Sequence, residues 1–342
     1  MKKINCAIIG FGNIGKLQAE FLIKNKNTDL IYICEKNIKI VKKNKNKYKN
    51  IKWSLNENEI FKDKRIDLVL ICSYDNFHYS QILKAIKHNK NIFCEKPICQ
   101  NLNQLRKINT LLKKKRNLKL SSNLILRTVS EFKLLKNIIN KKKIGKIYYS
   151  EADYNYGRLN KITKGWRSLI PFYSVISGGG VHVIDIICNF LKEYPTSVFS
   201  YANNIITEKS KFKYNDFVVS ILNFKSKKIS KISANFGCNT PHHHQVKFFG
   251  TKGTYLKEFS GSNLIMNRDN IRKKAKKFFF KKKYNKSELL DNFIENLNKN
   301  SNVKKIPSIY DVIRVMLVCF AIEKSYKTNK EIKINYNNLK LN

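Results

Sequence analysis

The first fifteen residues constrain this chain most, because they combine a strand pattern, a glycine motif and the start of a helix. The apolar run from Cys6 to Ile9 leads directly into a G-x-G-x-x-G motif, and Lys16 to Lys24 place apolar side chains at helical spacing. This order is typical of a turn that holds a dinucleotide pyrophosphate at a helix N-terminus. A glycine-rich turn without a ligand is the alternative. The motif predicts cofactor contacts at Gly10, Phe11, Gly12, Asn13, Ile14 and Gly15.

A carboxylate stands where the second half of such a site needs one. The predicted strand Leu30 to Cys34 ends at Glu35, about 20 residues after Gly15. A carboxylate at this place accepts hydrogen bonds from a ribose diol and repels a 2′-phosphate, which favours NAD. Lys36 and Lys39 leave NADP open.

Strand and helix patterns alternate through the first third of the chain. Runs such as Ile66 to Cys72 and Asn91 to Cys94 are typical of buried parallel strands, so we expect a doubly wound α/β Rossmann domain over 1–123. Beyond it, several strand-like runs follow one strand–helix unit. These predict an α+β domain over 124–342, with a largely antiparallel sheet, that binds substrate and mediates oligomerisation. A C-terminal helix, Asp311 to Tyr326, is expected to pack back between the domains.

Composition excludes several classes of protein. With 342 residues, of which 42% are hydrophobic, the chain is long and apolar enough to fold. It has no apolar run of about 18 residues and no signal-like cleavage site, so we expect no membrane span and a cytoplasmic location. None of the eight cysteines forms a C-x-x-C pair, and we expect reduced thiols and no metal site.

The formal net charge of +44 raises the question of nucleic acid. Lysines spread over the whole chain carry most of it, whereas selective phosphate contact favours arginine on one face. We interpret the excess as compositional and expect it to attract anionic substrates such as nucleotide sugars, with no nucleic-acid partner. Arg272 to Lys286 combines a basic run with four aromatic residues. A membrane or nucleic-acid contact there is the alternative to a strand or loop at the domain edge.

Two further motifs carry a family resemblance. Cys94-Glu95-Lys96-Pro97 follows the fifth predicted strand, and Gly178 to Leu191 is a predicted glycine-led helix that contains His182. With the opening turn, they resemble the Gfo/Idh/MocA oxidoreductases over essentially the whole chain. The similarity is to sugar-oxidising members associated with surface-polysaccharide and nucleotide-sugar pathways. It implies hydride transfer between a sugar carbon and nicotinamide C4, a substrate held in the second domain, and a homodimer or homotetramer.

The two predicted catalytic residues are Lys96 and His182. A lysine at a strand carboxyl end can bind the reacting oxygen and stabilise a developing alkoxide, and imidazole suits transfer of the hydroxyl proton. Glu95 would pair with Lys96 or position the cofactor, and Pro97 is compatible with a cis bond. Asp185 lies one helical turn after His182 and would orient it, unless it is an ordinary first-turn carboxylate.

The chain departs from the family pattern at Gly178. Many members have an aspartate four residues before the helix histidine, and this chain has a glycine there. A catalytically inactive NAD(P)-binding sensor or assembly protein is therefore the second hypothesis. The remaining expected cofactor contacts are Ser73, Tyr74 and His78, with a packing or capping role as the alternative for His78. The expected substrate-binding residues are Arg127, Tyr156, Arg158, Trp166, Arg167, Asp185 and His243, the last as the one substrate-facing member of the run 242–244 in a strand turn.

Overall fold

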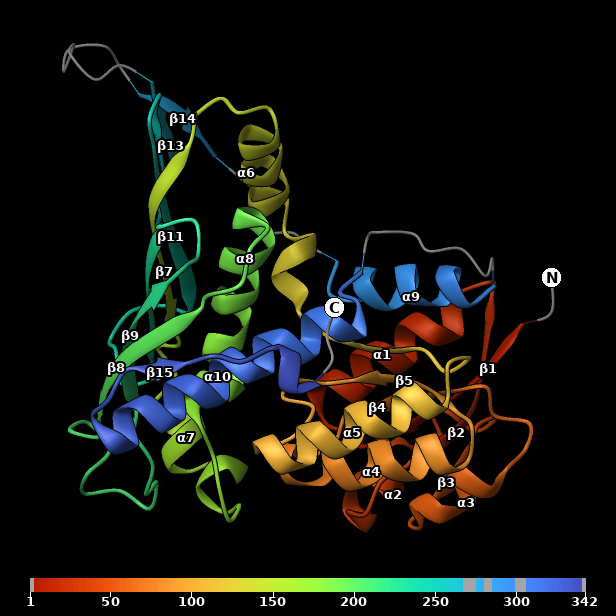
Figure 1. Cartoon of the computed structure of the whole chain (residues 1–342). Coiled ribbons are helices and arrows are strands. Elements are labelled where there is room, and N and C mark those ends of the chain that lie inside the picture. The colour runs from red at the N-terminus through yellow and green to blue at the C-terminus, as the bar shows by residue number, and fades with distance from the viewer. Residues whose placement is uncertain (1–2, 267–274, 280–284, 299–305, 340–342) are drawn as a thin grey trace. The chain divides into compact units, whose positions relative to one another are not determined.

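The chain folds into two compact units in the computed structural model (Figure 1). The structure describes residues 3–266, 275–279, 285–298 and 306–339. The first unit comprises 1–123 with 286–313, and the second comprises 124–285 with 314–342. The segment 286–313 thus belongs with the first unit, which differs from the continuous domain over 124–342 expected from the sequence.

The first unit is built on a parallel sheet with the strand order β3-β2-β1-β4-β5-β6 among the residues described. This order confirms the predicted doubly wound sheet. Because the order reverses between β1 and β4, their carboxyl ends form the switch point at which such sheets bind ligands. The strands are β1 (Ile4–Ile9), β2 (Thr28–Cys34), β3 (Lys52–Ser54), β4 (Leu68–Ile71), β5 (Asn91–Cys94) and β6 (Leu120–Ser122), and the helices between them are α1 (Asn13–Lys24), α2 (Ile38–Lys45), α3 (Glu57–Lys62), α4 (Asp75–Lys87) and α5 (Leu102–Lys114).

Helix α9 (Glu288–Asn298) explains why a late segment joins the first unit. Its apolar residues Leu289, Leu290, Phe293 and Ile294 are buried in the same core cluster as strands β1, β2 and β4. The ring of Phe293 lies 5.7 Å from that of Phe93 on β5. Figure 1 shows α9 alongside α1. Burial of this apolar face fixes the segment to the Rossmann sheet.

The second unit contains the order β14-β13-β12-β11-β7-β10-β9-β8-β15 within the described ranges. Only β7 and β10 pair in parallel among these strands, which confirms the largely antiparallel sheet. Helix α8 packs on β7 and β10. The strands are β7 (Ile147–Asn155), β8 (Ser197–Asn203), β9 (Phe217–Asn223), β10 (Ile229–Asn235), β11 (His243–Gly250), β12 (Thr254–Glu258), β13 (Gly261–Ile265), β14 (Lys276–Phe278) and β15 (Ile332–Lys333); the helices are α6 (Ser130–Asn140), α7 (Asn160–Thr163), α8 (Val181–Leu191) and α10 (Ile309–Thr328), within which the division between the units falls.

Three further sequence expectations concern membrane spans, cysteines and the basic–aromatic run. No helix in the described part of the chain is both long and apolar enough to span a membrane. All eight cysteines are free thiols. The basic–aromatic run over 272–286 contributes the edge strand β14, and its residues 272–274 and 280–284 lie outside the described residues.

Candidate active site

The opening glycine turn has the backbone that a dinucleotide site requires. Gly10 has a φ of +92°, and an added β-carbon there would lie 2.7 Å from the backbone of Cys72. A β-carbon at Gly15 would collide with the Gly10 carbonyl, whereas one at Gly12 would meet nothing within 4 Å. In the described structure no side chain caps α1, and its first turn holds no acidic residue. Its N-terminal amides and the space above Gly12 therefore fit a pyrophosphate.

Two matched substitutions separate the roles of these glycines. Gly12→Ala is expected to leave the unfolding free energy within about 1 kcal/mol of the wild type, the range of an ordinary Gly-to-Ala change. The same variant is expected to weaken NADH binding at least about tenfold, because the added methyl group keeps the pyrophosphate from the backbone. Gly15→Ala is expected to lower stability by more than about 2 kcal/mol because its methyl group has no room. Urea unfolding and NADH fluorescence titration measure the two quantities. Equal NADH affinity in wild type and Gly12→Ala would contradict pyrophosphate contact at Gly12.

Glu35 closes the other side of this turn. Its Oε2 atom accepts a hydrogen bond from Phe11 N at 2.7 Å, and its Oε1 atom accepts one from Asn37 N at 2.9 Å. A carboxylate offers about four lone-pair sites, so both oxygens can accept further bonds from ribose hydroxyls. The Lys36 ammonium instead lies 4.8 Å from the centre of the Phe77 ring. The arrangement fits the predicted preference for NAD.

The loop after β5 presents Lys96 at the carboxyl edge of the same sheet. Lys96 is half-buried and precedes a cis peptide bond to Pro97. Before it, Glu95 N donates to Ile71 O on β4 at 2.8 Å, and the Glu95 carboxylate accepts from Asn123 Nδ2 at 2.7 Å. Burial raises the pKa of Glu95, while the nearby Lys96 charge and the Asn123 hydrogen bond act against the rise.

The remaining expected cofactor contacts, Ser73, Tyr74 and His78, differ in exposure and in hydrogen bonding. Tyr74 is 48% exposed and stands at the N-cap of α4. Ser73 Oγ donates to Gln81 Oε1 at 2.6 Å. His78 is fully buried, and both of its ring nitrogens face backbone carbonyls, those of Pro97 at 2.7 Å and Ser73 at 3.0 Å. These contacts make His78 a link between two loops.

In the second unit, His182 lies within a cluster of aromatic rings. It is buried near the start of α8 and stacks on Tyr154 of β7, with 6.1 Å between ring centres and 20° between planes. Tyr154 also lies 5.5 Å from Phe236, and Tyr156 lies 4.5 Å from the same ring. Burial raises the pKa of Tyr154, so its phenol is neutral at physiological pH. A buried imidazole against flat apolar faces suits both a polar and a stacking contact with a sugar.

Tyr173 occupies the space that a side chain at position 178 would need. A β-carbon added at Gly178 would lie 2.6 Å from Tyr173 Cζ and closer still to its hydroxyl. Arg167 Nε donates to that hydroxyl at 3.0 Å, and the guanidinium lies 4.5 Å from the centre of the Trp166 ring. A phenol held by a guanidinium therefore fills the space beside position 178, which explains physically why position 178 is glycine.

Asp185 forms an ion pair with Arg127, which the sequence analysis predicts to bind substrate. Arg127, in the turn Ile125–Thr128, donates from Nε to Asp185 Oδ2 at 2.8 Å and from Nη2 to Oδ1 at 2.5 Å. The two side chains are 11% and 1% exposed. The bidentate pair fixes α8 to this turn, and the orienting role of Asp185 toward His182 stays a prediction.

Of the three consecutive histidines, His243 and His244 begin β11 and His242 directly precedes it. His242 and His244 lie against Tyr154, with ring centres 5.3 and 5.0 Å away. His243 Nε2 accepts from Asn155 Nδ2 at 3.2 Å, His243 Nδ1 donates to Pro241 O at 2.7 Å, and the ring packs on Phe259. His242 and His244 thus contact the ring of Tyr154 on which His182 stacks, whereas His243, the expected substrate contact, packs on Phe259. Burial holds the pKa of His244 well below its ordinary value.

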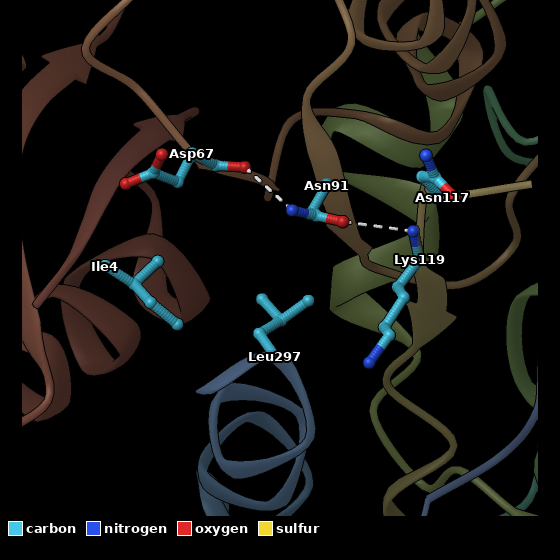
Figure 2. Close-up of a pocket in the computed structure, with 6 residues that line it drawn as sticks. All are labelled: Ile4, Asp67, Asn91, Asn117, Lys119 and Leu297. Atoms are coloured by element: carbon cyan, nitrogen blue, oxygen red, sulfur yellow. Dashed lines mark hydrogen bonds between the residues drawn. The ribbon is translucent and has the colours of Figure 1, made fainter. Parts of the chain in front are cut away.

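A cavity of about 230 Å³ lies elsewhere in the first unit (Figure 2). It is at the amino ends of the strands, away from the glycine turn. Asn91 Nδ2 donates to Asp67 O at 3.2 Å, and Asn91 Oδ1 accepts from Lys119 N at 3.0 Å. Lys119 Nζ in turn donates to Asn296 O at 2.7 Å. These polar groups hold the amino ends of the strands together, whereas the glycine turn and Lys96 follow the carboxyl ends of β1 and β5.

Two family models match the chain. Residues 4–123 match the oxidoreductase family with an NAD-binding Rossmann fold, and residues 132–256 match the GFO/IDH/MocA C-terminal domain. The chain belongs to the Gfo/Idh/MocA family. It is thus an oxidoreductase with an NAD-binding domain.

The similarity of this Gfo/Idh/MocA protein to other dehydrogenases extends over nearly the whole chain. The myo-inositol 2-dehydrogenase of Thermotoga maritima is 25% identical over 338 residues, covering 96% of this chain and 97% of the relative. A levoglucosan dehydrogenase solved with NADH and L-sorbose superposes with a TM-score of 0.85 at 17% identity, covering 98% of this chain and all of the other. The scyllo-inositol dehydrogenase of Lactobacillus casei, solved with NAD(H) and scyllo-inositol, gives 0.78 at 18% identity, covering 97% and 98%. The two structures share the fold.

Sequence reasoning about this Gfo/Idh/MocA protein missed three residues of the His182 cluster. His242 and His244 were recognised as part of the histidine run 242–244, but His243 was predicted as its one substrate-facing member. Tyr173 gave no local signal, because its relation to Gly178 depends on how the chain folds back before α8.

Proposed function

We propose that this protein is an NAD-dependent dehydrogenase that oxidises a CH–OH group of a sugar or nucleotide sugar, in the biosynthesis of a surface-polysaccharide sugar. The observation that supports it best is the pairing of the glycine turn with a fixed Lys96 loop at one edge of a parallel sheet. The full-length similarity to a myo-inositol 2-dehydrogenase agrees with a polyol or sugar substrate.

Each catalytic candidate has a role that its surroundings support. Bound NAD would supply the hydride acceptor. The Lys96 ammonium would bind the reacting oxygen and stabilise negative charge that develops on it. His182 would take the hydroxyl proton, since imidazole exchanges protons near neutral pH. Tyr154 and Tyr156 would offer ring faces to the sugar.

Positive charge around Tyr156 favours a nucleotide sugar over a neutral sugar. The guanidinium carbons of Arg158 and Arg167 lie 5.6 and 5.8 Å from the centre of the Tyr156 ring. The sequence from 154 to 184 contains no acidic residue. The acids on either side have cationic neighbours, Lys231 at 2.6 Å from Asp153 and Arg127 for Asp185. Arginine binds phosphate oxygens bidentately, so this segment suits a diphosphate.

A substrate panel with two charge-matched variants tests the proposal. NADH formation is measured with myo-inositol, scyllo-inositol, D-glucose and UDP-N-acetylglucosamine. Arg158→Gln is expected to lower kcat/KM for the nucleotide sugar about 10- to 100-fold, which is the usual effect of one charged hydrogen bond, and to leave the neutral substrates unchanged. Lys164→Gln removes the same charge from the same segment and is the control. Equal effects of the two variants, or turnover of neutral polyols alone, would contradict a nucleotide-sugar substrate.

The second candidate function is an NAD-binding sensor or assembly protein without turnover. Gly178, with Tyr173 filling the adjacent space, is the observation that favours it. Tight NADH binding with no NADH formation from any substrate of the panel would support the sensor and contradict the dehydrogenase.

A further inference from the structure

One buried imidazole joins the loop after β4 to the loop after β5, which carries Lys96. His78 lies in the first turns of α4 and has no exposed surface. Its Nδ1 atom is 2.7 Å from Pro97 O, in the loop after β5, and its Nε2 atom is 3.0 Å from Ser73 O, in the loop after β4. A carbonyl oxygen only accepts, so the ring is the donor in each hydrogen bond. A neutral ring donates at one nitrogen and a protonated ring at both.

Backbone hydrogen bonds hold the loop on both sides of Lys96, and the one at Pro97 O involves His78. On its amino-terminal side, Glu95 N is bonded to Ile71 O of β4, and Asn123 N is bonded to Cys94 O. On its carboxyl-terminal side, Pro97 O lies 2.7 Å from His78 Nδ1. The backbone of Lys96 is thus held between two fixed peptide groups, and one of them depends on an imidazole nitrogen.

We propose that His78 is a positioning residue for Lys96: its Nδ1–H holds the Pro97 carbonyl, and this hydrogen bond sets the place of the Lys96 ammonium. The inference rests on the proposed catalytic role of Lys96. It replaces the direct cofactor contact expected for His78, because both ring nitrogens are committed to backbone carbonyls inside the protein. Placement matters because a shift of about 1 Å in a catalytic group can cost about 100-fold in rate.

Two variants of His78 separate its two hydrogen bonds. The amide nitrogen of asparagine is bonded to Cγ, as Nδ1 is, so His78→Asn keeps a donor near Pro97 O and loses the one at Ser73 O. The amide nitrogen of glutamine lies one bond further out, as Nε2 does, so His78→Gln keeps the donor near Ser73 O and loses the one at Pro97 O. Each variant removes one of two hydrogen bonds from the same buried site, so a merely structural role predicts similar losses of stability and of activity for both.

The experiment compares the full-length variants with the same substitution elsewhere on α4. His88, which caps the carboxyl end of this helix and stacks on Phe61, provides the control His88→Gln. We expect His78→Gln to lower kcat about 30- to 100-fold, with the Kd for NADH within about threefold of wild type. His78→Asn is expected to retain kcat within about fivefold, and His88→Gln to match the wild type. Deuterium uptake of the peptide 93–101 is expected to rise in His78→Gln and to stay unchanged in His78→Asn.

The outcomes divide as follows. Equal kcat losses in His78→Asn and His78→Gln, the reverse order, or a loss that falls on the Kd for NADH overturns the positioning role. If the wild-type chain forms no NADH with any substrate of the panel, the proposed function has failed. Deuterium uptake then decides the inference by itself, because uptake equal in the two His78 variants shows that Nδ1 does not hold the loop.

Discussion

Replacing Lys96 with methionine is expected to lower kcat for NADH formation by about 100- to 1,000-fold, the usual cost of removing one group that stabilises a developing oxyanion. Methionine keeps the length and apolar stem of the side chain and removes the ammonium. The loop backbone is bonded through Glu95 and Pro97, so the fold and the glycine turn are expected to be unaffected. Steady-state kinetics measure kcat, and fluorescence titration measures the Kd for NADH.

The control for Lys96→Met is Lys87→Met, which removes a charge from the exposed end of α4. It is expected to turn over as the wild type does. A Lys96→Met enzyme that retains more than about a tenth of the wild-type kcat would reject the role of Lys96 in the chemical step, since one oxyanion contact accounts for more than that. A loss of NADH affinity that accounts for the whole decrease would move Lys96 to cofactor binding.

Arg127→Met is expected to lower the free energy of unfolding by about 3–5 kcal/mol, the typical cost of removing one partner of a buried ion pair. The Asp185 carboxylate is 1% exposed and accepts two hydrogen bonds from Arg127. Without the guanidinium, a buried charge loses its principal counter-charge while its desolvation remains. Urea unfolding, followed by circular dichroism, measures the change.

A double variant and a surface pair provide the controls for this prediction. Arg127→Met combined with Asp185→Leu is expected to recover most of the loss, because it removes both buried charges. Lys3→Met breaks a pair with Asp29 whose side chains are 52% and 48% exposed, and is expected to cost less than about 1 kcal/mol. If Arg127→Met were as mild as Lys3→Met, the pair would not stabilise α8, and Arg127 would be available for the substrate role that the sequence suggested.

Local patterns in the sequence were sufficient for the Rossmann sheet. Strand Asn91–Cys94 was predicted with the bounds that the structure has. Buried parallel strands are continuous apolar runs, and the helices between them have a regular apolar spacing, so each element carries its own signal. The glycine turn was predictable for the same reason, since its three glycines serve the tight turn, the approach of a pyrophosphate and the helix packing within six residues.

The tertiary structure decided what depends on residues distant in the chain. Helix α9 joins the first unit because its apolar face has a partner there, and no local pattern says which core a face will enter. His78 proved to link two loops, and Tyr173 proved to fill the space beside Gly178. The sequence by itself determined the fold class and the glycine turn after the first strand, because periodicity and glycine geometry are local. Packing determined which side chains support that chemistry, because burial and hydrogen bonding depend on contacts that form only when the chain has folded.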